Sequence, residues 1–197
     1  FAFLPESAPS YLELYLPPQQ YQRMECQSAS SDFILSGYAL NANTLLLSSA
    51  SGDFFFTGRF EPVAANTPSG AICAAEISSQ TLSCSSTSGE VNIQHAKAKE
   101  LKASTVSGDI LLEQATGKTS VNLSTTSGEI TGGQLSCGEL LASSVSGDIS
   151  LSGSFSAVNG NTTSGELSFT DTQTPEHLSC SSVSGSIWIT LPEHKGF

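Results

Sequence analysis

The chain carries little positive charge. Seven lysines and arginines stand against eighteen aspartates and glutamates, and the formal net charge at pH 7 is −11. Nucleic acids and anionic lipid surfaces are bound by basic patches, so neither is expected as a partner. The sequence also has no apolar run long enough to span a bilayer, which argues against membrane insertion within this chain.

Recognisable catalytic motifs are missing as well. There is no Gly-x-Ser-x-Gly elbow, no His-Glu-x-x-His pair and no phosphate-binding glycine loop. The three histidines are scattered, without metal-ligand spacing: His95, His177 and His194. Lys97, Lys99 and Lys102 cluster near Glu100, and we interpret this cluster as a solvated turn. The sequence therefore predicts a protein that is not an enzyme and that needs no cofactor.

The five cysteines are an odd number and have no metal-binding or redox spacing. Cys26, Cys84 and Cys180 share one inward position of the repeat described below, in coils too far apart for a disulfide. We expect them to be buried as small hydrophobic residues. Cys73 falls at an outward position and Cys137 in a loop.

What the sequence does contain is a repeat of nine copies, anchored on a Ser-Gly-acid step. Six copies match fully and three are degenerate. The anchor serines are Ser30, Ser51, Ser69, Ser88, Ser107, Ser127, Ser146, Ser164 and Ser184. Successive anchors are separated by 21, 18, 19, 19, 20, 19, 18 and 20 residues. A fixed period of this size predicts a solenoid, and the repeat predicts one domain over residues 12–197.

Apolar residues recur at fixed distances from the anchor. Six residues before it stand Met24, Leu45, Val63, Leu82, Leu101, Val121, Leu140, Val158 and Leu178. Three residues after it stand Phe33, Phe54, Ile72, Val91, Ile110, Ile130, Ile149, Leu167 and Ile187. Because neighbouring positions alternate between apolar and polar, each repeat predicts two short strands with one buried face. A looser apolar position, eight or nine residues after the anchor, predicts a third and less regular side: Phe60, Ile77, Ala96, Ala115, Leu135 and Phe155.

These patterns predict an all-β fold, a β-helix of about nine coils of ~19 residues in which each coil pairs in register with the next. At the anchor, glycine would supply the positive φ of a sharp corner. The serine before it would bond nearby backbone, and the Ser or Thr two residues earlier would form a hydroxyl ladder.

An acidic column follows the anchor glycine. Its members are Asp32, Asp53, Glu90, Asp109, Glu129, Asp148 and Glu166. Stacked carboxylates could recruit Ca²⁺, but the glycine-rich nonapeptide of calcium-binding β-rolls is missing. The preferred interpretation is a charged edge that keeps the protein soluble and discourages aggregation.

The first coils also carry apolar residues at outward positions. We single out Ile34, Leu46 and Phe55 as a candidate patch for a partner or a cap. The segment 1–11 lacks the repeat, and Phe1, Phe3 and Leu4 could fold over this patch. Otherwise the patch, or the open ends of the coil, could support oligomerisation.

The segments from Ala103 to Ile110 and from Ala142 to Ile149, with the Ser-Gly-acid steps at their centres, resemble a bacterial family of adhesin-type domains of unknown function. The resemblance covers roughly residues 12–191. It implies a single-stranded, right-handed β-helix, commonly encoded with a membrane anchor, and it supplies no catalytic residues.

The expected function is therefore that of a non-catalytic β-solenoid displayed at a bacterial cell surface, an adhesin or scaffold with a cell-surface glycan or protein as ligand. Since the sequence begins with Phe1 and shows no signal peptide, this location implies a signal or anchor segment absent here. One alternative is a carbohydrate-active β-helix enzyme. Another is a structural or regulatory spacer that oligomerises.

Overall fold

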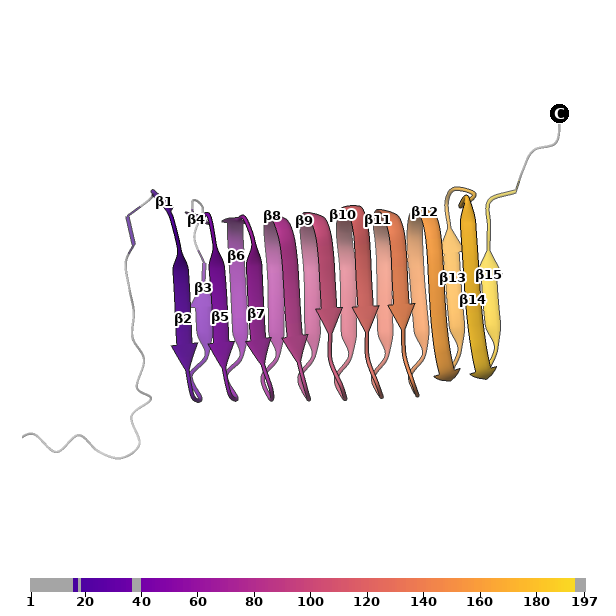
Figure 1. Cartoon of the computed structure of the whole chain (residues 1–197), viewed down its shortest axis with the longest axis horizontal. Helices are drawn as coiled ribbons and strands as arrows, with labels where there is room; N and C mark the ends of the chain where they lie inside the picture. Colours follow the sequence, from indigo (N-terminus) through magenta and orange to yellow (C-terminus); the bar gives the residue numbers. More distant parts are fainter. Residues whose placement is uncertain (1–15, 18, 37–39, 194–197) are drawn as a thin grey trace, which may run out of the picture.

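The computed structural model describes residues 16–17, 19–36 and 40–193, which form one solenoid of parallel β-strands (Figure 1). Fifteen strands join in a single sheet, and all the pairings between them are parallel. The described residues contain no helix, so none of them forms a helix that could cross a bilayer. The predicted all-β solenoid is confirmed.

The strands differ in length along the chain. In order they are β1 (Gln20–Tyr21), β2 (Met24–Ser28), β3 (Phe33–Leu35), β4 (Asn41–Ala42), β5 (Leu45–Ser49), β6 (Phe54–Phe60), β7 (Val63–Thr67), β8 (Ile72–Ser86), β9 (Val91–Ser104), β10 (Ile110–Ser124), β11 (Ile130–Ser143), β12 (Ile149–Ser164), β13 (Leu167–Asp171), β14 (His177–Ser184) and β15 (Ile187–Thr190). In the middle of the solenoid, β8 to β12 each continue across the third side without a break, which makes one long bent strand of each coil (Figure 1).

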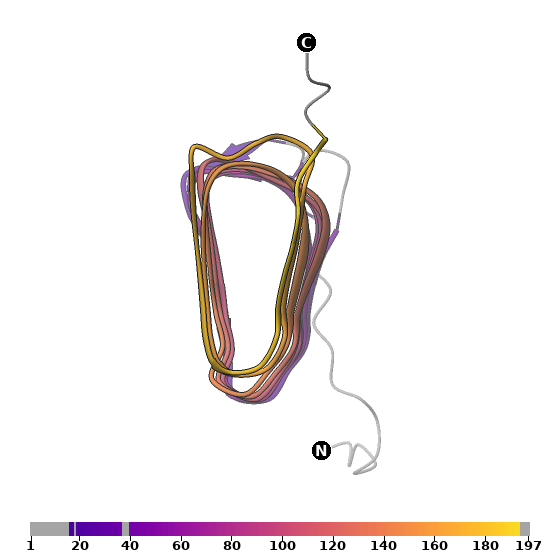
Figure 2. The same ribbon diagram turned by 90° about the vertical axis from the view of Figure 1, so that its right-hand side faces the viewer.

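The coil is right-handed and elongated in cross-section. In Figure 1 the chain advances from left to right, with the nearer strands β2 and β5 running down and the more distant β3 and β6 running up. A chain that winds in this direction while it moves to the right forms a right-handed coil, the same hand as most crossover connections between parallel β-strands. Along the axis, two long sides meet at a narrow corner below and are joined by a broader third side above (Figure 2). The Ser-Gly-acid steps lie at the narrow corner, between β2 and β3, β5 and β6, and β7 and β8.

The strand register confirms the two principal columns read from the repeat. Ile110 pairs with Val91 on one side and Ile130 on the other. On the opposite long side, Val121 pairs with Leu101 and Leu140. These side chains point inward and are almost fully buried. Burying each such side chain contributes about 2 kcal/mol, and only the neighbouring coils provide the apolar surface that covers it.

The third side differs in part from the predicted column. Ile77, Ala96 and Ala115 stack in register, but Phe155 pairs with Cys137, two residues further along the strand than Leu135. Cys137 was expected in a loop and instead lies within β11, with its side chain buried. The reason is a shift of register between Gly132 and Leu135. The third side therefore has two neighbouring columns of inward positions, one that includes Leu135 and one that includes Cys137 and Phe155.

Glycine at the narrow corner serves close stacking more than an unusual backbone angle. Among the anchor glycines, only Gly165 and Gly185 have positive φ, at 155° and 157°. A Cβ on Gly128 would lie 1.8 Å from the carbonyl oxygen of Gly108, in the coil before. A Cβ on Gly147 would lie 1.7 Å from the carbonyl oxygen of Gly128. The prediction that these glycines need a positive φ is therefore wrong for most coils. A side chain is excluded at this position because its Cβ would overlap the backbone of the preceding corner.

The hydroxyl ladder is confirmed, and its hydroxyls connect successive coils. Thr125 Oγ1 accepts the N–H of Gly128 at 3.0 Å and donates to the carbonyl of Gly108 at 3.3 Å. Thr67, Ser86 and Thr105 make the same pair of bonds in their own coils. These side chains are buried, so no water competes for the bonds. The anchor serines are exposed instead, and the corner is held by the residue two positions before them.

Substituting alanine for Gly128 should destabilise the protein strongly, because the added Cβ overlaps the preceding corner. We expect a loss of about 3 kcal/mol and a fall of the melting temperature by roughly 6–12 °C. Gly133→Ala is the matched control, since its Cβ would meet nothing closer than Ser152 Oγ at 3.8 Å. Thermal melts followed by circular dichroism measure both. Equal melting temperatures for the two variants would refute this account of the corner.

Substituting valine for Thr125 keeps the shape of the side chain and removes both of its hydrogen bonds. We expect a cost of about 2 kcal/mol, because the buried N–H of Gly128 and carbonyl of Gly108 lose a partner. Thr126→Val is the control: the side chain is exposed, and the repeat places Val106 and Val145 at this position. Urea denaturation should separate the variants, and an unaffected Thr125→Val protein would show that the ladder contributes nothing.

Candidate functional site

The seven carboxylates of the acidic column lie in register along the narrow corner, and aspartate has a structural role there. Asp109 Oδ1 accepts the backbone N–H of Glu129, in the next coil, at 2.8 Å. Asp148 accepts the N–H of Glu166 at 2.7 Å in the same way. The same bond runs from Asp53 to Asp32 and from Ala71 to Asp53. One oxygen of each of these aspartates therefore joins successive corners.

The acidic column does not gather into a metal centre. The described ranges contain no group of three or more His, Cys, Asp or Glu side chains placed to hold a metal ion. Calcium requires six to eight oxygen ligands around one point, whereas the column offers its carboxylates in a row. Calcium binding at this edge is not proposed.

The apolar residues picked from the first coils lie on two different faces. Ile34 in β3 and Phe55 in β6 pair in register, with exposed fractions of 75% and 38%. Leu46 lies in β5 on the opposite long side, where it pairs with Glu25 and Ala64 and is half-buried (Figure 1). The predicted cap in residues 1–11, with Phe1, Phe3 and Leu4, lies outside the described residues.

The last strands expose further apolar surface. Trp188 in β15 is 61% exposed, and the inward-column residues Ile187 and Ile189 are partly exposed as well. The cause is that β15 pairs with β13 on one side and with no other strand in the described part of the chain.

The broad third side has a different character, because its outward residues are polar and basic. In β9, His95, Lys97 and Lys99 point outward and alternate with the buried Ala96 and Ala98. The lysine cluster was predicted to be a solvated turn. That prediction is wrong, because inward and outward residues keep alternating through this segment and β9 crosses the third side without a break.

Two outward rows run along the axis here and border a hollow surface. One row holds Glu76, His95 and Gln114 in register. The other holds Arg59, Ser78, Lys97 and Thr116. They line hollows of about 800 Å³ and 570 Å³ that share Arg59, Ser78, Lys97 and Thr116. We call the surface formed by both hollows the third-side groove; its charged and polar lining residues include Arg59, Glu61, Glu76, His95, Lys97, Lys99, Gln114, Lys118 and Gln134.

Gln134 reaches the groove through an uncommon backbone conformation. Its φ is 55°, in the left-handed region that residues other than glycine rarely adopt. It lies between Gly132 and Leu135, where the register between β11 and β12 shifts. Its side-chain oxygen accepts a hydrogen bond from the amide of Gln114. Strain of this kind concentrates at functional sites, which supports a role for the groove.

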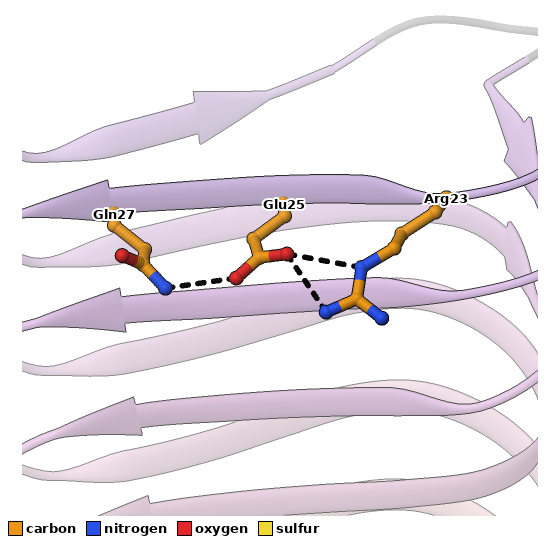
Figure 3. Close-up of polar contacts among 3 residues, drawn as sticks. All are labelled: Arg23, Glu25 and Gln27. Atoms are coloured by element: carbon orange, nitrogen blue, oxygen red, sulfur yellow. Dashed lines mark hydrogen bonds and ion pairs between the residues drawn. The ribbon is translucent and has the colours of Figure 1, made fainter.

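The cations of the groove form no ion pair with any described residue. Four line the two hollows: Arg59, Lys97, Lys99 and Lys118. Within the described ranges the ion pair present is that of Arg23 with Glu25, at 2.8 Å, on the outer face of β2. Gln27 donates to the other oxygen of Glu25, so both oxygens of that carboxylate are engaged (Figure 3). In contrast, the four groove cations are unpaired within the described ranges.

A comparison with known families identifies the solenoid. The model of the Toastrack DUF4097 family, a domain of unknown function, matches residues 3–152. The chain belongs to this family. No curated protein and no solved structure matches it. The matched range of the Toastrack domain includes all of the third-side groove, and the coils continue past it through β15.

The predicted separation of Cys26, Cys84 and Cys180 is confirmed, but the prediction that all three are buried is wrong, because Cys26 and Cys180 lie in end coils and are only partly buried. All five cysteines are free thiols. Cys26, Cys84 and Cys180 share one inward column in separate coils. Burial raises the pKa of the Cys84 thiol to about 12. Burial is also the main cause that raises the pKa of Cys137 to about 12. Both thiols are therefore protonated near neutral pH.

Alkylation at pH 8 should distinguish these thiols. We expect iodoacetamide to modify Cys73, which points outward, and to leave Cys84 and Cys137 unmodified while the protein is folded, because the reactive thiolate is scarce and covered. In denaturant all five cysteines should react. Mass spectrometry of the peptides gives the extent at each site. Modification of Cys84 as fast as Cys73 in the folded protein would contradict the stacked core.

Proposed function

We propose that this Toastrack domain is a non-catalytic binding module displayed at a bacterial cell surface, with an adhesive or scaffolding role, and that its ligand lies in the third-side groove. The observation that supports this most is the pair of polar rows across the groove. His95 and Gln114 occupy equivalent positions in neighbouring coils, about 4.8 Å apart along the axis. Polar side chains at a regular spacing suit a linear polymer with repeating units, such as a glycan.

The scaffold behind the groove is rigid. Ile77, Ala96 and Ala115 form a buried column directly beneath the outward rows. The strands that carry the rows pair with neighbours on both sides, so the positions of the polar side chains are fixed by the backbone. A preformed surface loses little conformational freedom when a ligand binds, which favours affinity. Surface display is supported by the resemblance to adhesin-type domains, which are commonly encoded with a membrane anchor.

A second candidate function is a carbohydrate-active enzyme, and one observation favours it. Glu76 and His95 are register partners in the groove, and a carboxylate beside an imidazole can support acid–base catalysis. Such an enzyme would release new sugar ends, which a binding module does not. A third candidate, an oligomerising spacer, is favoured by the exposed apolar residues around Trp188.

Native affinity electrophoresis of the full chain, through gels containing cell-wall, host or plant polysaccharides, tests the proposal. We expect one class of glycan to retard the protein without release of reducing ends. The double variant His95→Ala/Gln114→Ala should lose most of this retardation. Asn122→Ala, in β10 but on a long side away from the groove, should keep it.

Each other result has a defined meaning. Release of sugar ends, abolished by His95→Ala, would establish the enzyme instead. Retardation that survives the double variant would place the ligand elsewhere on the solenoid and refute the groove. Free migration in every gel would reject glycan binding and favour the spacer, which sedimentation of the full chain would then reveal as an oligomer.

A further inference from the structure

We infer that the ligand of the third-side groove is an acidic polysaccharide whose carboxylates pair with the four groove cations. This inference rests on the proposed function and names the class of its ligand. The two hollows are lined by four cations and by two carboxylates, Glu61 and Glu76, which gives a local net charge of +2 with histidine neutral. The whole chain carries −11. Four of the chain's seven basic residues thus line these two hollows, and the exposed carboxylates of Glu100 and Glu113, beside Lys99 and Gln114 in the same strands, are not among the lining residues.

The acidic column does not cancel this local charge. It lies at the narrow corner, at the opposite end of the cross-section from the third side (Figures 1 and 2). From Asp109 to Thr116 the chain covers roughly 20 Å of extended strand. The Debye length at physiological ionic strength is about 8 Å, so the exposed column is screened from the groove. The groove can therefore attract an anion although the net charge of the protein is negative.

The spacing of the cations suits a chain with separated charges. Arg59 and Lys97 belong to one column with Ser78 between them, which places them two coils or about 10 Å apart along the axis. Lys99 and Lys118 add charge beside this row, in adjacent coils. A polysaccharide with a carboxylate on some or all of its sugars can meet such a row while lying along the axis. Duplex DNA carries one negative charge per ~1.7 Å of its axis, so its linear charge density is much higher than the spacing of these cations matches.

The uncharged lining also favours sugars over nucleic acid. Ser78, Gln114 and Thr116 provide hydroxyl and amide groups that can both donate to and accept from sugar hydroxyls. Single-stranded nucleic acid needs exposed aromatic rings on which bases stack. Among the residues that line the two hollows, the ring of Phe60 is fully buried, which leaves the imidazole of His95 as the exposed ring and provides no row of rings for successive bases.

The direct test uses polygalacturonate and the same polymer after complete methyl esterification, which keeps the backbone and removes the charge. We expect the full chain to bind polygalacturonate in affinity electrophoresis, to lose that binding on esterification, and to bind more weakly as salt is added. Equal binding of the acidic and esterified polymers would overturn the inference.

Variants that remove positive charge locate the contact. Replacing Lys97, Lys99 and Lys118 with glutamine should weaken binding roughly tenfold, since each exposed pair contributes modestly. The single variant Lys97→Gln should weaken it by a smaller factor, whereas Lys102→Gln, which also removes one charge from β9 but on a long side away from the groove, should bind like the unmodified protein. Circular dichroism melts confirm that the variants are folded. A triple variant that binds normally would overturn the inference.

The remaining outcomes separate this inference from the proposed function. Retardation by neutral glycans alone, lost in His95→Ala/Gln114→Ala, would keep the groove as the binding site and overturn its acidic ligand. Absence of binding to every glycan would overturn both. Binding of single-stranded DNA as tight as that of polygalacturonate would also overturn the inference, because the groove would then recognise charge density and not an acidic sugar chain.

Discussion

The close stacking of one corner on the next is the constraint on which the rest of this solenoid depends. At the narrow corner, successive backbones approach so closely that a Cβ on Gly128 would overlap the carbonyl of Gly108. The buried hydroxyl of Thr125 bonds to both of these glycines, and the carboxylate of Asp109 bonds to the following coil. Because these contacts admit one register, the positions on the two long sides that adjoin the corner are fixed relative to their counterparts in the next coil.

Variation in repeat length is confined to the opposite end of the cross-section. The register shifts occur after Phe56, Gly117 and Gly132, all on the third side. A shift there leaves the columns of the long sides in register, since both resume their pairing before the next corner. The same irregularity brings Gln134 into a left-handed conformation and helps to hollow the surface. The third side is thus the part of the coil where register is least constrained, and it is also where the outward residues differ most from one coil to the next.

The two ends of the cross-section also divide the charges between them. Aspartates such as Asp148 are held at the narrow corner by the backbone bonds that they accept. Lys97 and Lys99 lie on the third side, where they alternate with the buried Ala96 and Ala98 and therefore point outward. Acidic charge at the corner therefore contributes to the architecture, while the four groove cations have no ion-pair partner among the described residues. The net charge argued against nucleic acids and anionic lipid surfaces as partners, but a total does not record where the charges lie.

The sequence by itself determined the repeat, the all-β class, the register of both principal columns and the hydroxyl ladder, since each follows from a period that recurs in every coil. It also indicated that the cysteines of the inward column are too far apart to pair. Only the tertiary structure decided that Leu46 lies on a different face from Phe55, that Cys137 is inside a strand, and that His95, Lys97 and Gln134 border one groove. These features depend on how the irregular third side bends and shifts register, and no periodic pattern in the sequence specifies them.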